Sequence, residues 1–371
     1  MKKKISTITK FNKEIYALRF ALTTKCNLNC TYCFVKKDKK VFCLKEAKKI
    51  LNIFLNSPGK TKLLMIYGGE PLLFFSLLKE IIIFSRQEAR RNKKNLIISI
   101  GTNGLLLNEE ILDFFERKNI KLSVTLDGRK SFNDKARLSV SKKSSFNGVI
   151  KKIPLLLKNT KKQNRCILFG ILPSSVSNLF ENFLFILSLG FDSVNIEAIQ
   201  SPIFKWNDKQ KKCFSVEMKK VVVYIYGNIK RGNFIFLNSI NRELWNEGIS
   251  GSYKKAICPF YQNLEVYPDG EMTFSPFLMN SSDRKKYIIG TTDKGFLNKY
   301  EMCKYDHLSA VCKKCFGDYC NTNNQVKILA GDIVKIRNVY SIYMAMKIME
   351  IAKKEEVFSE YIDEAKERIF E

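Results

Sequence analysis

Six short apolar segments, most of them followed by a stretch with helical periodicity, constrain the fold of this 371-residue chain more than any other feature. The segments expected to form strands are 16–23, 63–67, 96–101, 122–126, 166–171 and 193–198. Those expected to form helices are 44–55, 72–92, 108–118, 146–158 and 176–189, with a kink or an early end expected at Pro154. Strands separated by helices favour a parallel sheet with right-handed crossovers.

This repeat predicts an α/β fold built on a partial (β/α)6 TIM-type barrel, whose active site would lie at the C-terminal ends of the strands. The polar motifs agree with that prediction, because each comes directly after an expected strand. They lie at residues 24–33, 68–71, 102–104 and 127–128. We therefore expect the four motifs to gather on one face.

The remainder of the chain predicts smaller parts beside this core. Pro-Asp-Gly at 268–270 is a turn signal within a region of short expected strands, and the tail from Asn324 is expected to form two amphipathic helices. The predicted division is a core domain at 1–200, a helical bridge at 201–257, a small cysteine-rich α+β domain at 258–325 and C-terminal helices at 326–371.

The formal net charge of +28, from 64 lysines and arginines against 36 aspartates and glutamates, has two interpretations. One is a solvated lysine-rich surface, and the other is a surface that steers an acidic or phosphate-bearing partner. No long basic tail concentrates the charge, so nucleic-acid binding is not indicated. No apolar run reaches about 18 residues and no signal peptide is evident, so we expect a cytoplasmic protein without a membrane anchor.

Eleven cysteines and a single histidine, His307, restrict the chemistry. One histidine leaves little basis for a Ser/His/Asp triad or a histidine-rich metal site. So many cysteines in a cytosolic chain indicate metal or redox chemistry rather than disulfides. Three cysteines fall within 26–33 and four within 303–320, with Cys258 ahead of the second group. The isolated cysteines are Cys43, Cys213 and Cys166, the last in an apolar segment that favours burial.

The first group has the spacing Cys26-x3-Cys30-x2-Cys33. Three thiolates so close together can ligate three irons of a cubane and leave the fourth iron open to a cofactor or substrate. A structural zinc site would require a fourth cysteine or histidine nearby, and none is present. The alternative is three incidental cysteines in a loop.

With Tyr32 directly before its third cysteine, this group resembles the signature of the radical S-adenosylmethionine (SAM) superfamily. Companion motifs follow in the order of that family: Gly68-Gly69-Glu70-Pro71, Thr102-Asn103-Gly104, and Thr125-Leu126-Asp127-Gly128 with Asn133, Asp134 and Arg137. The resemblance covers about the first half of the chain. It implies a [4Fe–4S] cluster on Cys26, Cys30 and Cys33 and SAM bound at its open iron.

The resemblance also implies a set of SAM-binding residues. Glu70 would accept a hydrogen bond from the methionyl ammonium, and Arg137 would bind the SAM carboxylate bidentately. The alternatives are a strand-to-helix turn for the first motif and a surface salt bridge for Arg137. Thr125 stands where maturase-type members have serine, and Asn133 stands where they have histidine, which puts a proton-transfer role at 133 in doubt. The expected cofactor-binding residues are Gly68, Gly69, Glu70, Asn103, Thr125, Asp127 and Arg137.

The second cysteine group resembles the SPASM domain, or the shorter twitch domain, of these enzymes. It departs from the SPASM pattern at Ser275, which replaces a cysteine, and in a shortened final run. Five thiolates remain, enough for one auxiliary [4Fe–4S] cluster. The expected ligands are Cys258, Cys312, Cys315 and Cys320. The spare Cys303 would be a buried bystander or a catalytic hydrogen-atom donor, and a zinc site is the alternative for the whole group.

The resemblance implies an enzyme that cleaves SAM to a 5′-deoxyadenosyl radical and abstracts hydrogen from a peptide or protein substrate. Such a ribosomal peptide maturase would carry out cross-linking, thioether formation or epimerisation, with a reductant such as a flavodoxin or ferredoxin. Only 15 residues precede the first expected strand, so we expect leader recognition by a separate protein or by the basic surface. The alternatives are an anaerobic sulfatase-maturase-like protein oxidase, a small-molecule-modifying twitch-type enzyme, and a non-catalytic Fe–S or Zn binding protein.

Overall fold

The computed structural model describes residues 14–199, 204–250, 263–273, 279, 284–296 and 331–368. The chain divides into two compact units. Unit 1 comprises Met1–Asn27, Phe34–Thr102 and Ile257–Leu308. Unit 2 comprises Leu28–Cys33, Asn103–Ala256 and Ser309–Glu371. No helix in the described ranges combines the length and the apolar character that a membrane crossing requires.

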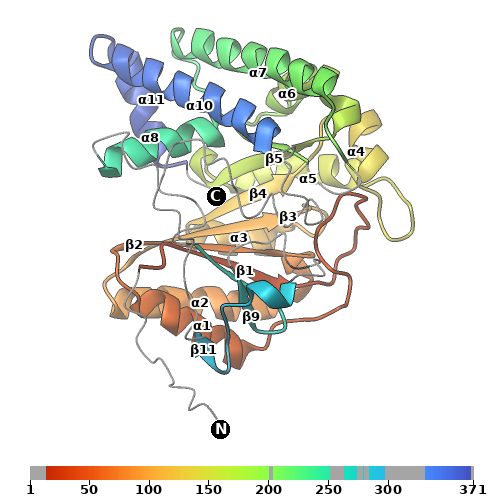
Figure 1. Ribbon diagram of the computed structural model, residues 1–371, viewed down its shortest axis with the longest axis vertical. Helices are drawn as coiled ribbons and strands as arrows, with labels where there is room; N and C mark the ends of the chain where they lie inside the picture. The colour runs from red at the N-terminus through yellow and green to blue at the C-terminus, as the bar shows by residue number, and fades with distance from the viewer. Residues whose placement is uncertain are drawn as a thin grey trace. The chain divides into compact units, whose positions relative to one another are not determined.

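Unit 1 contains a mixed sheet with two helices packed together beside it (Figure 1). Its strands, in spatial order, are β11 (Gly295–Phe296), β10 (Gly290–Thr291), β9 (Glu271–Thr273), β8 (Asn263–Val266), β1 (Ala17–Thr23), β2 (Thr61–Gly68) and β3 (Asn95–Thr102). The four strands from β8 to β3 run parallel, and β9 to β11 are antiparallel. The helices are α1 (Leu44–Asn56) and α2 (Phe75–Arg91), the second preceded by the 3-10 turn Pro71–Phe74.

The strands of unit 1 are buried on both faces, as expected for parallel strands of a barrel. On one face Phe20 is fully buried and packs on Phe42, just before α1, with 4.5 Å between ring centroids. On the other face Ala17, Leu63 and Met65 form a separate apolar cluster. Side chains alternate along each strand, so Arg19 and Tyr67 share the face of this second cluster.

Unit 2 contains parallel strands in the order β4 (Ile120–Thr125), β5 (Arg165–Ile171), β6 (Ser193–Ala198) and β7 (Phe236–Leu237). Its helices are α3 (Glu109–Arg117), α4 (Lys130–Ala136), α5 (Phe146–Asn159), α6 (Leu179–Ser188), α7 (Asp208–Ile229), α8 (Asn238–Ser250), α10 (Gly331–Ala352) and α11 (Glu356–Lys366). The 3-10 segments are Lys162–Asn164 and Pro173–Asn178. Helix α10 contacts α7, α8 and α11, and Figure 1 shows these helices grouped together.

All six predicted strands and all five predicted helices of the core are present, to within a few residues at their ends. The early end expected at Pro154 was wrong, because α5 continues to Asn159, and the kink stays a prediction. Pro154 lies on the exposed side of the helix, where water can satisfy the carbonyl that loses its partner. The short helix α4 and strand β7 were not predicted.

The expectation of two amphipathic C-terminal helices is correct for α11 and wrong for α10. Helix α11 buries one stripe, formed by Phe358, Tyr361 and Ala365. Helix α10 carries apolar side chains on more than one side, and its buried stripe includes the polar residues Arg337 and Ser341. Some of these apolar side chains remain exposed, among them Val339 and Tyr343.

Candidate active site

The three cysteines of the first group lie in the loop that follows β1. Cys26 belongs to unit 1, whereas Cys30 and Cys33 belong to unit 2, and all three are partly exposed and outside any disulfide. Within the described part of the chain, no three His, Cys, Asp or Glu side chains converge where one metal ion would bind. Thiolates that ligate separate irons of a cubane do not converge on one ion.

Gly68 and Gly69 in unit 1 bring the end of β2 against the residues that precede Cys26. The amide of Gly69 donates to the carbonyl of Thr23 at 2.6 Å, and that of Glu70 donates to the carbonyl of Lys25 at 2.8 Å. A Cβ on Gly69 would lie 2.0 Å from the Lys25 oxygen, and one on Gly68, whose φ is +134°, would lie 2.3 Å from the Thr23 oxygen. Only glycine permits this approach.

Glu70 is fully buried at the start of the 3-10 turn. Its Oε1 accepts hydrogen bonds from the Leu72 amide at 3.0 Å and from the Thr102 hydroxyl at 2.8 Å. The carboxylate therefore caps the turn and ties the end of β2 to the end of β3. Its contact with a methionyl ammonium stays a prediction.

Two side chains of unit 2, those of Asp127 and Arg137, meet at the phenol of Tyr32. The phenol donates to Asp127 Oδ2 at 2.5 Å and accepts from Arg137 Nη1 at 2.7 Å. Arg137 Nε and Asp127 Oδ2 are 4.0 Å apart, and both residues are only 6% exposed. The motif thus brings Asp127 and Arg137 together as the sequence suggests, but Tyr32 as their shared partner was not predicted.

Burial dominates the electrostatics of these groups. It raises the pKa of Tyr32 well above its usual value; Arg137 opposes this, and Asp127 and Cys30 add to it. Burial also raises the pKa of Asp127, while Arg137, Tyr32 and the Gly170 amide oppose the rise. Burial alone would lower the pKa of Arg137, yet Tyr32, Asp127 and Cys30 together raise it, so the guanidinium stays charged.

The remaining predicted residues of unit 2 have local roles in the described structure. Asn103 is 6% exposed, and its Oδ1 accepts from the Leu105 amide at 3.0 Å. Thr125 is the last residue of β4 and is partly buried. Asn133, in the place of the family histidine, accepts from the Asp127 amide at 3.2 Å, so its side chain supports Asp127.

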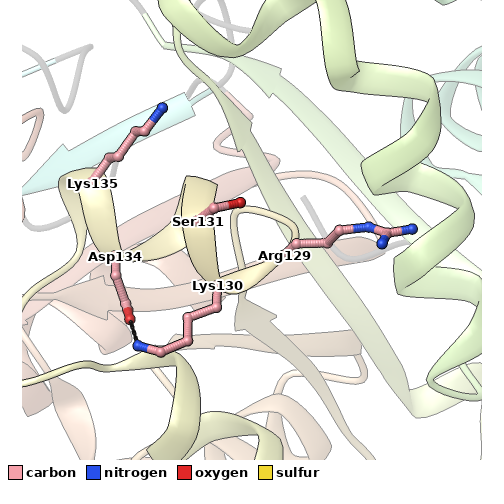
Figure 2. Close-up of a pocket in the computed structure, with 5 residues that line it drawn as sticks. All are labelled: Arg129, Lys130, Ser131, Asp134 and Lys135. Atoms are coloured by element: carbon pink, nitrogen blue, oxygen red, sulfur yellow. Dashed lines mark hydrogen bonds and ion pairs between the residues drawn. The ribbon is translucent and has the colours of Figure 1, made fainter.

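An open pocket lies on α4, directly after Asp127 and Gly128 in the sequence (Figure 2). Lys130 and Asp134 pair across it at 2.7 Å. Its lining residues are Arg129, Lys130, Ser131, Asp134 and Lys135. Three of the five are basic, so part of the positive charge of the chain lies beside a predicted SAM-binding motif.

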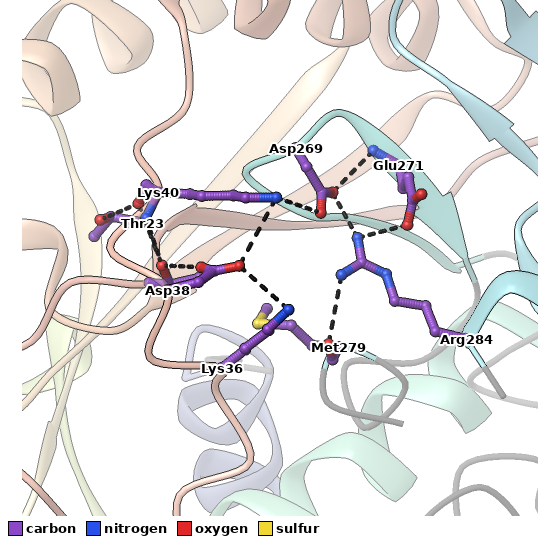
Figure 3. Close-up of polar contacts among 9 residues, drawn as sticks. Thr23, Lys36, Asp38, Lys40, Asp269, Glu271, Met279 and Arg284 are labelled. Carbon is purple, nitrogen blue, oxygen red and sulfur yellow. Dashed lines mark hydrogen bonds and ion pairs between the residues drawn. The ribbon is translucent and has the colours of Figure 1, made fainter. Parts of the chain in front are cut away.

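A charged network in unit 1 connects the segment that follows the cysteine loop to the region of the second cysteine group (Figure 3). Lys40 Nζ lies 3.3 Å from Asp269 Oδ2, and Arg284 Nη2 lies 2.5 Å from Asp269 Oδ1. Asp269 belongs to the predicted Pro-Asp-Gly turn, which is confirmed by Gly270 with φ of +80°. The carbonyl of Tyr267 accepts from the Gly270 amide at 2.8 Å.

Sequence reasoning missed a second buried polar group in unit 1, around Glu265 on β8. Glu265 is fully buried opposite Arg19, and its Oε1 accepts a short hydrogen bond from the Tyr67 hydroxyl. Its Oε2 and Arg19 Nε have no hydrogen-bond partner among the described residues. The signal was a lone acidic residue in the apolar segment Asn263–Val266.

The four cysteines predicted to ligate an auxiliary cluster and the spare Cys303 lie outside the described residues, as does His307. They are Cys258, Cys303, Cys312, Cys315 and Cys320. Their ligand roles and the proposed hydrogen donation by Cys303 therefore remain predictions. The isolated Cys166 is 1% exposed in β5, which confirms its expected burial.

Residues 20–200 match the family model of the Radical SAM superfamily. They form a radical SAM domain. The cysteine loop, the two glycines at the end of β2 and the Asp127–Arg137 segment all belong to this domain, and its family implies a [4Fe–4S] cluster and SAM.

Two curated relatives of the radical SAM domain are enzymes of different kinds. The cysteine-type anaerobic sulfatase-maturating enzyme of Clostridium novyi is 34% identical over 153 residues, 39% of this chain and 41% of that protein. The GTP 3′,8-cyclase of Clostridium perfringens is 25% identical over 284 residues, 71% of this chain and 81% of that protein. This chain spans about two fifths of the length of the first curated relatives it matches.

The fold is also that of a solved structure, anSMEcpe with bound AdoMet, with a TM-score of 0.73 at 16% identity. The similarity covers 94% of this chain and 98% of that one. The same protein has been solved with AdoMet and the Cp18Cys peptide, with a TM-score of 0.68. This likeness confirms the predicted α/β fold with parallel strands and many helices.

Proposed function

We propose that this chain is a radical SAM enzyme that abstracts a hydrogen atom from a peptide substrate, as a ribosomal peptide maturase does. The observation that carries the proposal is the approach of Gly68 and Gly69 to the backbone just before Cys26. It provides a tightly packed strand end next in space to the start of a loop, residues 24–33, that carries three cysteines and no histidine.

The donor set of this loop fits a cluster with one open iron. Cys26, Cys30 and Cys33 would hold the cluster, and the reduced cluster with SAM supplies a 5′-deoxyadenosyl radical when both are bound. The buried cation Arg137 provides a partner for the SAM carboxylate. Glu70, already fixed by two hydrogen bonds, provides one for the ammonium. The other proposed contacts with SAM are Gly68, Gly69, Asn103, Thr125 and Asp127.

A peptide substrate is supported by the curated relatives and by the charge of the chain. Sulfatase-maturating enzymes act on proteins by name, and the fold likeness includes a structure solved with a peptide. The basic residues of the pocket on α4, among them Arg129 and Lys135, would favour an acidic leader peptide. The proposed partners are a separate protein that recognises the leader and a flavodoxin or ferredoxin that reduces the cluster.

Small-molecule modification is a second candidate, because the Clostridium perfringens relative is a GTP 3′,8-cyclase that aligns with 71% of the chain. An anaerobic sulfatase-maturase-like oxidation of a protein is the third, supported by the similarity to the Clostridium novyi protein. The three candidates share the first cysteine group and differ in the molecule from which hydrogen is abstracted.

The proposal includes one auxiliary [4Fe–4S] cluster on Cys258, Cys312, Cys315 and Cys320. A variant with alanine at Cys26, Cys30 and Cys33 is expected to retain about four irons per chain after anaerobic reconstitution. Zinc without iron in that variant would show that the second cysteine group forms a structural zinc site rather than an auxiliary cluster.

The central test is anaerobic reconstitution with iron and sulfide, followed by dithionite and SAM. We expect 5′-deoxyadenosine from the wild type and none from Cys30→Ala. The matched control is Cys43→Ala, which removes an exposed cysteine outside the group and is expected to keep the wild-type yield. A yield from Cys30→Ala equal to that of the wild type would refute the catalytic proposal. Added GTP, or a synthetic peptide with an acidic leader, then separates the substrate classes by which one raises the yield.

A further inference from the structure

The segment Leu28–Cys33, which carries two of the three cysteines, is fixed to unit 2 by its backbone. The Asn29 amide donates to the Leu138 carbonyl at 2.9 Å, and the Thr31 amide donates to the Ala136 carbonyl at 2.9 Å. Leu28 forms an isolated antiparallel bridge with Ser139. The segment therefore pairs with residues 136–139 as a short strand would.

The side chain of Tyr32 adds a second attachment on the same segment. Its hydroxyl is held between Asp127, at the end of β4, and Arg137, at the end of α4. Both bonds involve a charged partner in a buried setting, where such bonds are stronger than neutral ones. Tyr32 stands between Cys30 and Cys33, so this attachment lies within the expected cluster loop.

The two partners of Tyr32 are themselves fixed. Asp127 Oδ1 accepts from the Gly170 amide at 3.0 Å, and the Asp127 amide donates to Asn133. Asn133 Nδ2 donates to Ser145 Oγ at 2.9 Å, and the Ser145 hydroxyl donates to the carbonyl of Arg137. The anchor thus extends over β4, β5 and α4, and it does not depend on any bound group.

We propose that the Tyr32 hydroxyl, clamped between Asp127 and Arg137, is a positioning group that orders the Cys30–Cys33 segment and thereby slows loss of the cluster. The proposal rests on the proposed function, because it needs the cluster on this loop. It assigns Arg137 a role in holding the cysteine loop, in addition to the predicted contact with SAM.

The test is release of iron from the reconstituted protein to an excess of chelator, followed by the absorbance of the iron complex. Y32F keeps the ring and removes only the hydroxyl. We expect it to release the first cluster at least about tenfold faster, the factor that one lost charge-assisted hydrogen bond corresponds to. The first cluster is identified by its electron paramagnetic resonance signal in the reduced state, which is expected to change when SAM is added.

The matched control is Y361F, the same substitution at a fully buried tyrosine of unit 2. The Tyr361 hydroxyl donates to the carbonyl of Ile235 at 3.2 Å, away from the cysteine loop, so Y361F should release iron at the wild-type rate. Thermal melting of the apoproteins separates an unfolded variant from a folded one. R137K, which keeps the charge but not the planar guanidinium, provides a second variant if Y32F does not fold.

The double variant Y32F/D127N distinguishes a clamp from general weakening of the fold. If the two residues act through the same hydrogen bond, the double variant will release iron no faster than the faster single variant. Rates that multiply, or a Y32F rate equal to that of the wild type, would overturn the proposal. A wild type that holds no SAM-responsive cluster would instead refute the proposed function.

Discussion

Replacement of Glu265 by glutamine is expected to stabilise the protein, and the gain is expected to increase with pH. The carboxyl group is fully buried and accepts one hydrogen bond, from Tyr67, while its Oε2 has no partner among the described residues. Burial raises its pKa to about 8, although Arg19 and the bond from Tyr67 oppose the rise. The native state therefore keeps a proton that the unfolded chain loses near the ordinary value of 4.5.

The size of the effect follows from this difference in pKa. Because the native state binds the extra proton between pH 4.5 and about 8, the free energy of unfolding falls as pH rises through that window. The slope is about 1.4 kcal/mol per pH unit, which gives roughly 3 kcal/mol at neutral pH and roughly 5 kcal/mol at the upper end. Glutamine cannot ionise and keeps a carbonyl that accepts from Tyr67. The free energy of unfolding of E265Q should therefore exceed that of the wild type by these amounts, and by less than about 1 kcal/mol near pH 5.

The assay is urea unfolding of wild type and E265Q with equal iron content, at several pH values across the window. The control is E217Q, at a glutamate that is also buried but is ion-paired with Lys220 and accepts from the Phe180 amide at 3.0 Å. It should destabilise the protein throughout, because it removes a charged partner. A difference between E265Q and wild type that is constant over pH, or a loss that grows with pH, would show that Glu265 is ionised and stabilised by Arg19.

Two further substitutions probe one unit each. Gly69→Ala is expected to weaken SAM binding at least about tenfold in equilibrium dialysis, because its Cβ would lie 2.0 Å from the Lys25 carbonyl oxygen and displace the strand end. Gly101→Ala is the matched control, since its Cβ would meet one side-chain carbon at 4.0 Å; equal effects of the two would contradict the argument. Arg337→Met is expected to lower the free energy of urea unfolding by about 2–3 kcal/mol, because Arg337 on α10 donates to the Ile196 carbonyl at 3.2 Å and is buried. An unchanged unfolding midpoint would show that α10 is held by apolar contacts alone.

The strands and helices of the core could be predicted from the sequence because each has a strong local signal. The strand β2, for example, is an apolar run that ends at two glycines, and α3 begins at Asn108, whose side chain accepts from the Ile111 amide at 2.9 Å. Helix α4 was missed because its seven residues, Lys130–Ala136, contain only two apolar side chains, too few to establish a helical period.

The residues of the site could be predicted only as far as motifs identify them. Asp127 and Arg137 follow from a motif, but their joint contact with Tyr32 spans 95 and 105 residues of sequence, and no local pattern carries it. The pair of Glu265 and Arg19 depends on the register between β8 and β1, which the sequence does not contain. Long-range register and side-chain partners thus had to come from the structure.

Asp127 and Glu265 show how partners decide what a buried carboxyl group does. Both are buried and both have a raised pKa, but Asp127 accepts hydrogen bonds from Tyr32 and the Gly170 amide and is ion-paired with Arg137. In D127N one of the two acceptor oxygens becomes an NH2 group, which would face either the Tyr32 hydroxyl or the Gly170 amide. Arg137 would also lose its carboxylate partner. We therefore expect D127N to destabilise the protein by about 3–5 kcal/mol in the urea assay, opposite in sign to E265Q. A stabilising D127N would mean that burial outweighs the two hydrogen bonds and the ion pair, and that the carboxyl group is protonated in the native state.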